Sequence, residues 1–250
     1  MKVKYKKGTF IFLLFVIIFI WYRYEYLNID LLKKKKINKN LKIRVIMLCT
    51  PNYYDEGKAG IKFFKEYCQK YDYDFKLYTK KLIPDLHINF SKMKMLAIEL
   101  QKNDVDYTLL TDADVIGDIN NTIPLETLIE HCNTTCLSMP KDVVCGLVFK
   151  NHSLRIIQNS SINAGFIIGK NNTDAHKIMQ KWIDKSYTTC KKEANMHPRN
   201  QNVFDTCILP YLRKGELTFI PWQIAGTRYS QIFPHLHLHD TELPNRHKDT

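Results

Sequence analysis

A short apolar run that ends directly in two acidic residues constrains the fold more than any other part of this chain. Residues 107–111 (YTLLT) have the composition of a strand buried on both faces, and Asp112-Ala113-Asp114 follows without a linker. Side chains at positions i and i+2 of an extended segment point to the same side, so the two carboxylates should lie together. We therefore expect a buried sheet that carries an acidic pair where one of its strands ends.

Apolar runs alternate with amphipathic helical patterns from residue 42 onward. Residues 43–50 are almost continuously apolar, as in a buried strand, and residues 57–71 place apolar side chains on one helical stripe. Further strands are predicted at 73–79, 143–149, 165–169 and 217–220, and further helices at 91–102, 174–186 and 202–213. This alternation predicts an α/β fold with a mostly parallel sheet, in which ligands bind beyond the carboxyl ends of the strands.

The positive charge of the chain is concentrated at its N-terminus. The formal net charge of the 250 residues is +12, and residues 1–42 account for +9 of it, with ten Lys and Arg23 against Glu25 and Asp30. The remaining residues carry only +3. A basic face for nucleic acid is therefore not expected, and nucleic acid is not predicted as a partner.

The N-terminal segment predicts a membrane anchor. An uncharged apolar run, residues 9–22, follows several lysines, and we interpret residues 9–24 as a single-pass signal-anchor helix. Residues 1–8 would then be a cytoplasmic tail, 25–41 a stem and 42–250 a lumenal domain. A cleaved signal peptide also fits a basic start and a short apolar run. Cleavage requires small residues after the run, however, and the sequence continues with Trp21, Tyr22, Arg23 and Tyr24.

Two further features fit a lumenal domain. Six N-x-[ST] sequons begin at Asn89, Asn120, Asn133, Asn151, Asn159 and Asn171. Seven cysteines permit up to three disulfides in an oxidising compartment and leave at least one thiol free. An Asn-rich composition alone is the alternative explanation of the sequons.

The acidic pair indicates a metal site. Two carboxylates held so close repel each other unless a cation lies beside them, and hard divalent ions prefer oxygen ligands. Asp112 and Asp114 could therefore hold a cation that bridges to a substrate diphosphate. The alternative is a turn at the end of the strand with two solvated acids.

Several segments resemble known glycosyltransferases. Residues 90–115 (FSKMKMLAIELQKNDVDYTLLTDADV) resemble the helix–strand–DxD block of retaining, nucleotide-sugar-dependent glycosyltransferases of the GT-A fold, which is Rossmann-like. Residues 67–81 resemble glycosyltransferase family 34, the Golgi α-galactosyl-, mannosyl- and xylosyltransferases. Residues 50–57 (TPNYYDEG) are more similar to the first loop of family 8. The segment 163–165 (NAG) matches a strand that both families carry, and the resemblance covers residues 42–212.

The resemblance implies roles for individual residues of the donor site. Asp112 and Asp114, with Ala113 between them, would hold Mn²⁺ or Mg²⁺ at the diphosphate, and Lys92 would approach the diphosphate as a positive charge. The residues expected at the nucleobase are Thr50 and Tyr54, with Tyr53 as the alternative. The residues expected at the donor sugar are Asn163, Ala164 and Gly165.

The resemblance also implies catalytic and metal-binding residues nearer the C-terminus. Gln201 lies beside the anomeric carbon in this comparison, and Gln201 and Asn163 are the expected catalytic residues. The families often place acids on both sides of this glutamine, whereas this chain has Asn200 and Asn202. The third metal ligand would be a histidine, for which His237 is the first choice among His235, His237 and His239. A solvated histidine-rich tail is the alternative.

The sequence thus predicts a metal-dependent hexosyltransferase that is a single-pass type II glycoprotein of the Golgi or ER membrane. It would move a hexose or pentose from a nucleotide-diphosphate sugar, with UDP the expected nucleotide, to a glycan or glycoprotein acceptor, with retention of configuration. An inactive sugar- or nucleotide-binding module on the same fold is one alternative. A membrane-tethered protein that acts through its basic N-terminus is another.

Overall fold

The computed structural model describes residues 16, 29–35, 41–141, 146–150, 153–157, 162–228 and 230–236, with the backbone alone for 146–150 and 153–157. The chain divides into two compact units, Met1–Ile37 and Asn38–Thr250. In the first unit, residues 29–34 are helical. The predicted signal anchor, residues 9–24, lies outside the described residues except for residue 16. Within the described ranges, no helix combines the length and apolar character needed to cross a membrane.

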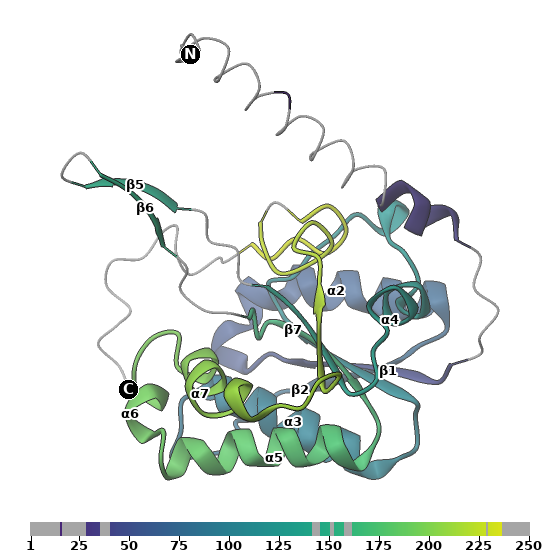
Figure 1. Ribbon diagram of the computed structural model, residues 1–250. Helices are drawn as coiled ribbons and strands as arrows, with labels where there is room; N and C mark the ends of the chain where they lie inside the picture. Colours follow the sequence, from purple (N-terminus) through teal and green to yellow (C-terminus); the bar gives the residue numbers. More distant parts are fainter. Residues whose placement is uncertain are drawn as a thin grey trace, which may run out of the picture. The chain divides into compact units, whose positions relative to one another are not determined.

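A six-stranded sheet forms the centre of the second unit, in the order β2-β1-β3-β7-β4-β8 (Figure 1). Its strands are β1 (Ile43–Leu48), β2 (Asp74–Tyr78), β3 (Tyr107–Asp112), β4 (Leu137–Pro140), β7 (Phe166–Lys170) and β8 (Leu217–Ile220). β1 pairs in parallel with β2 and β3, and β4 with β8, whereas β7 runs antiparallel to β3 and β4. A separate hairpin pairs β5 (Gly146–Lys150) with β6 (Ser153–Ile157). The predicted α/β fold with a mostly parallel sheet is confirmed.

Helices cover both faces of the sheet (Figure 1), which explains why the central strands are apolar on both sides. One face carries α2 (Tyr54–Tyr71) and α4 (Leu125–Cys132). The other face carries α3 (Ile88–Lys102), α5 (Thr173–Tyr187) and α7 (Asn200–Cys207), with the short α6 (Lys191–Ala194) between the last two in sequence. In β1 and β3, the side chains of Val45, Ile46, Leu109 and Leu110 are fully buried.

The helices on the α3 side are joined by packing and by a covalent bond. Trp182 of α5 is fully buried, its Nε1 donates to the Asn200 carbonyl at 2.8 Å, and its ring packs on Phe204. A disulfide links Cys190 to Cys207. Trp182 is therefore a core residue, and these contacts fix the start of α7 against α5.

An aromatic cluster on the α2 side anchors the C-terminal segment. The Phe233 ring lies 5.1 Å from Phe166 of β7 and 6.2 Å from Phe64 of α2, measured between ring centroids. All three side chains are fully buried. Burial of an aromatic side chain of this size contributes on the order of 2–3 kcal/mol, so this packing holds residues 233–236 against the domain.

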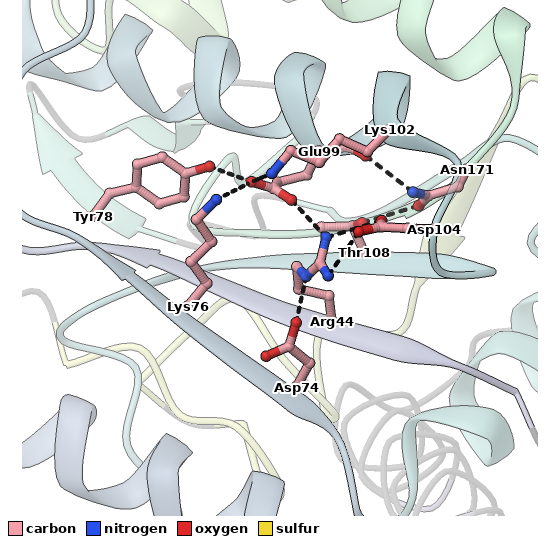
Figure 2. Close-up of polar contacts among 9 residues, drawn as sticks. All are labelled: Arg44, Asp74, Lys76, Tyr78, Glu99, Lys102, Asp104, Thr108 and Asn171. Atoms are coloured by element: carbon pink, nitrogen blue, oxygen red, sulfur yellow. Dashed lines mark hydrogen bonds and ion pairs between the residues drawn. The ribbon is translucent and has the colours of Figure 1, made fainter.

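A cluster of charged residues surrounds Glu99 of α3 (Figure 2). The Glu99 side chain of α3 is completely buried, and its carboxylate accepts hydrogen bonds from Lys76, Lys102 and Arg44, each at 2.7 Å, and from the Tyr78 hydroxyl. A buried carboxylate is stable only when it is paired in this way. The cluster thus joins α3 to β1 and β2.

The predicted elements are present, with shifted ends. The helix predicted at 57–71 begins at Tyr54, and the helix predicted at 202–213 spans Asn200–Cys207 and is followed by a 3-10 turn at Leu209–Tyr211. The sequence did not predict α4, β4 or β6, nor the reversed direction of β7.

Candidate functional site

The acidic pair lies where the sequence predicts it, at the end of β3. The Asp112 amide donates to the Gly165 carbonyl at 2.8 Å, so the last residue of β3 is held against the chain that leads into β7. Beyond β3, the Leu236 amide donates to the Asp114 carbonyl at 3.0 Å, and Val115 forms an antiparallel bridge with His235. This pairing brings the C-terminal segment to the acidic pair.

Three potential metal ligands converge there. The His235 Nε2 lies 2.9 Å from Asp114 Oδ1 and 3.8 Å from Asp112 Oδ2. One ligand atom from each of the three residues falls within 4.8 Å of the others. Two carboxylate oxygens and one imidazole nitrogen form a donor set that suits Mn²⁺ and that Mg²⁺ can also accept.

Among the residues that the structure describes, His235 is the histidine that lies beside the acids. His237, the first choice from the sequence, and His239 both lie outside the described residues, so the prediction for them remains untested. His235 is 5% exposed. Burial alone would lower the pKa of His235, but its hydrogen bond with Asp114 and the charges of Asp114 and Asp112 outweigh this, and the pKa is raised.

Gly165 leaves the space that this cluster occupies. A Cβ at residue 165 would lie 2.6 Å from His235 Cε1, 2.8 Å from Asp112 Oδ2 and 2.9 Å from Asn163 Oδ1. Any side chain here would displace the potential ligands, so glycine is required by close approach. The predicted place of Gly165 beside the site is consistent with this geometry.

The middle residue of the acidic motif is packed against α2. A Cβ added at Gly60 would lie 2.0 Å from the Ala113 carbonyl oxygen, and one at Gly57 would lie 2.9 Å from Ala113 Cβ. The Gly57-x-x-Gly60 spacing therefore lets α2 approach the acidic motif closely. Sequence reasoning missed this role, although two glycines one helical turn apart, shortly after a strand, were the available signal.

Tyr53 and Tyr54 lie at the start of α2, just beyond the carboxyl end of β1. Their side chains are 41% and 55% exposed, which is unusual for large rings and leaves them accessible for stacking. Thr50 precedes this turn and its carbonyl accepts from the Tyr53 amide at 2.9 Å. The residues predicted at the nucleobase thus lie at the same edge of the sheet as the acidic pair.

Lys92 places a positively charged side chain at the site. Its Nζ lies 2.5 Å from Asp112 Oδ1, and the residue is 9% exposed. A buried lysine requires a negative partner, which Asp112 provides. The predicted positive charge therefore lies directly beside the acidic pair.

The segment before β7 is held by a buried asparagine and contacted by Gln201. Asn163 accepts from the Gly165 amide through Oδ1 and donates through Nδ2 to the Gly226 carbonyl, both at 2.8 Å. Its polar atoms are thus engaged in positioning the loop. The Ala164 amide donates to Gln201 Oε1 at 3.4 Å, which places the start of α7 beside the same loop.

Comparison with known proteins identifies the fold. No protein-family model and no curated protein matches the chain. Among solved structures, it is similar to a glycosyltransferase involved in the glycosylation of the major capsid of PBCV-1, at 13% identity, with a TM-score of 0.57 over 78% of this chain and 93% of that chain. It also matches A197 from STIV, at 13% identity and a TM-score of 0.41, over 72% of this chain and 82% of that chain. The chain therefore shares its fold with a solved glycosyltransferase, which is consistent with the GT-A type and does not single out family 34. Asp112, Asp114 and His235 are a possible divalent-metal site on this fold.

Proposed function

We propose that this protein is a metal-dependent glycosyltransferase that moves a sugar from a nucleotide-diphosphate donor, with UDP the expected nucleotide, to a glycan or glycoprotein acceptor. The observation that carries the proposal is the convergence of Asp112, Asp114 and His235 at one edge of the sheet in a glycosyltransferase fold. Ligands of such sheets bind at this edge. Retention of configuration rests on the family resemblance of the sequence.

Each residue of the site has a defined task under this proposal. Asp112, Asp114 and His235 would hold Mn²⁺ or Mg²⁺, which when bound stabilises the negative charge of the departing diphosphate. Lys92 places a second positive charge at the same point. The exposed Tyr54 ring stacks on the base, and Gln201 presents its amide to the donor sugar as a dipole that stabilises developing positive charge.

We also propose that the domain lies in the lumen of the Golgi or ER, held by a signal anchor at residues 9–24. The apolar run, its basic flank and the sequons support this location. The Cys190–Cys207 disulfide supports it as well, because such bonds persist in oxidising compartments.

The deciding experiment combines a sugar-nucleotide panel with an Asp112→Asn variant. The wild-type protein is expected to show transfer or slow donor hydrolysis with Mn²⁺, and a chelator should abolish it. Asp112→Asn should lower the rate at least about 100-fold, because one of two anionic ligands is lost. Asp184→Asn, which changes an exposed carboxylate on α5, serves as the matched control and should keep full activity. Undiminished activity in Asp112→Asn, or with chelator, would contradict the proposal.

A binding module without turnover is the second candidate, and the replacement of both acids beside Gln201 favours it. The Asn202 Nδ2 donates to the Met196 carbonyl at 2.8 Å, so the Asn202 side chain stabilises the loop that precedes α7. Asn200 is 2% exposed, and its Nδ2 makes no hydrogen bond within the part of the chain that the structure describes. Metal-dependent nucleotide binding without any turnover over the donor panel would support this candidate.

A further inference from the structure

The Asn163 side chain connects the two chain segments that carry the candidate metal ligands. Its Oδ1 accepts from the Gly165 amide at 2.8 Å, and the Gly165 carbonyl in turn accepts from the Asp112 amide at 2.8 Å. Its Nδ2 donates to the Gly226 carbonyl at 2.8 Å and lies 3.5 Å from His235 Nδ1. One side chain therefore reaches Asp112 through a single neighbour and contacts His235 directly.

The backbone around Asn163 completes its link to the histidine. Gly226 precedes Thr227, whose carbonyl accepts from the His235 amide at 2.9 Å. His235 is thus held at two points, its amide by the loop that Asn163 binds and its ring by Asn163 itself. The backbone amide of Asn163 donates to the carbonyl of Pro140, the last residue of β4, at 2.8 Å. The asparagine is therefore fixed to the central sheet.

These contacts argue against a direct chemical role for Asn163, which the sequence predicts as a catalytic residue at the donor sugar. Asn163 is 2% exposed, and both ends of its amide have partners. The orientation of the amide is fixed, because the Gly165 amide requires an acceptor and the Gly226 carbonyl requires a donor. A buried amide that is satisfied in this way stabilises the arrangement of its neighbours and has little surface to offer a sugar.

We propose that Asn163 is a positioning residue that holds His235 beside the acidic pair, where the three side chains can bind one divalent cation. The inference rests on the proposed metal-dependent function and deepens it, because it assigns a residue that sets the metal affinity. Asp112 and His235 belong to segments far apart in the sequence, so their separation depends on contacts between those segments. Residues behind metal ligands commonly orient them in this way.

Mn²⁺ titration of the full chain without nucleotide, followed by isothermal titration calorimetry, tests the positioning role. The variant Asn163→Ala removes both ends of the amide. Asn171→Ala is the matched control, because Asn171 is 8% exposed and also makes two side-chain hydrogen bonds, with the Thr108 hydroxyl at 2.9 Å and the Glu99 carbonyl at 3.1 Å (Figure 2). Thr108 lies near the start of β3, whereas Asp112 is its last residue.

A second pair of variants tests the same link without changing Asn163. The φ angle of Gly226 is +98°, and a Cβ there would lie 2.5 Å from Pro140 Cβ, so Gly226→Ala must shift the carbonyl that Asn163 binds. Gly215→Ala is the matched control, because its φ angle is +92° and its Cβ would meet Thr135 Oγ1 only at 3.8 Å. If Asn163→Ala fails to fold, this pair still decides the question.

Asn163→Ala and Gly226→Ala should each weaken Mn²⁺ binding at least about tenfold, with changes within about twofold in the two controls. Hydrogen exchange in a peptide that spans residues 233–236 should be at least about tenfold faster in both variants, because the segment is no longer held, and unchanged in the controls. Melting temperatures should fall similarly within each pair, so a purely structural effect would move variant and control together. Unchanged Mn²⁺ affinity in both variants, or equal losses in the controls, would overturn the positioning role.

Nucleotide titrations separate this inference from the proposed function. With Mn²⁺ saturating, Asn163→Ala should change the affinities for UDP and UDP-glucose by the same factor. A loss confined to UDP-glucose, with Mn²⁺ affinity unchanged, would make Asn163 a sugar ligand and overturn the inference. If neither nucleotide binds but Mn²⁺ affinity depends on Asn163 and Gly226 and not on the controls, the positioning role stands and the nucleotide-sugar proposal fails. A wild-type chain that binds no Mn²⁺ would overturn both.

Discussion

Replacing Glu99 by Gln tests whether the charge cluster around this buried carboxylate stabilises the fold. Burial alone would raise the pKa of Glu99, but the hydrogen bonds from Lys102, Lys76, Tyr78 and Arg44 lower it from an ordinary 4.5 to about 2. The difference between these values corresponds to about 3 kcal/mol in favour of the folded state at neutral pH. Lys76 and Lys102 are 40% and 38% exposed and can be solvated again, so we expect Glu99→Gln to lose about 2–3 kcal/mol.

The pH dependence gives this prediction a second test. The pKa of Glu99 is lower in the folded state than in the unfolded state. Its contribution is therefore fully present above pH 4.5 and is lost as the pH falls through about 2. Urea unfolding of wild type and variant should differ most at pH 7, and the difference should shrink by about 1 kcal/mol at pH 3.5.

The matched control for this experiment is Glu66→Gln. Glu66 lies on α2, is 48% exposed and pairs with Lys62 at 3.9 Å, so its replacement should change the free energy of unfolding by less than about 0.5 kcal/mol. A loss in Glu99→Gln no larger than in this control would refute the reasoning. So would a large loss that stays constant between pH 7 and pH 3.5.

Two further predictions concern the site. Gly165→Ala should weaken Mn²⁺ binding by more than about tenfold, as measured by titration calorimetry, because the added Cβ overlaps His235 and Asp112. The same overpacking should lower the free energy of unfolding by about 1–3 kcal/mol. Gly169→Ala, in the strand β7 that follows Gly165, would place its Cβ 3.0 Å from the flexible Leu100 side chain and 3.5 Å from Leu137, away from the acids, and should keep the metal affinity. Tyr54→Ala should weaken UDP binding about tenfold with an unchanged melting temperature, because the exposed ring acts by stacking. Tyr54→Phe keeps a ring and should bind UDP like wild type. A Tyr54→Ala protein that binds UDP like wild type would exclude the stacking role.

Much of the central sheet could be predicted from the sequence because β1 and β3 are buried on both faces and therefore read as continuous apolar runs. β4 was missed because it has only four residues and ends in Pro140, so it offers too short a pattern. The reversed direction of β7 was missed for a different reason. An apolar run has the same composition in either direction, and its orientation follows from long-range pairing.

The same distinction applies to the candidate site. Asp112 and Asp114 follow a recognisable strand, so local sequence was enough to place them. The position of His235 beside the acids depends on a bridge to Val115, formed by residues 120 positions apart in the chain, and a pattern of alternating histidines does not define that register. The packing of Phe233 in the aromatic cluster fixes the position of the C-terminal segment, and with it the register that the local pattern cannot define.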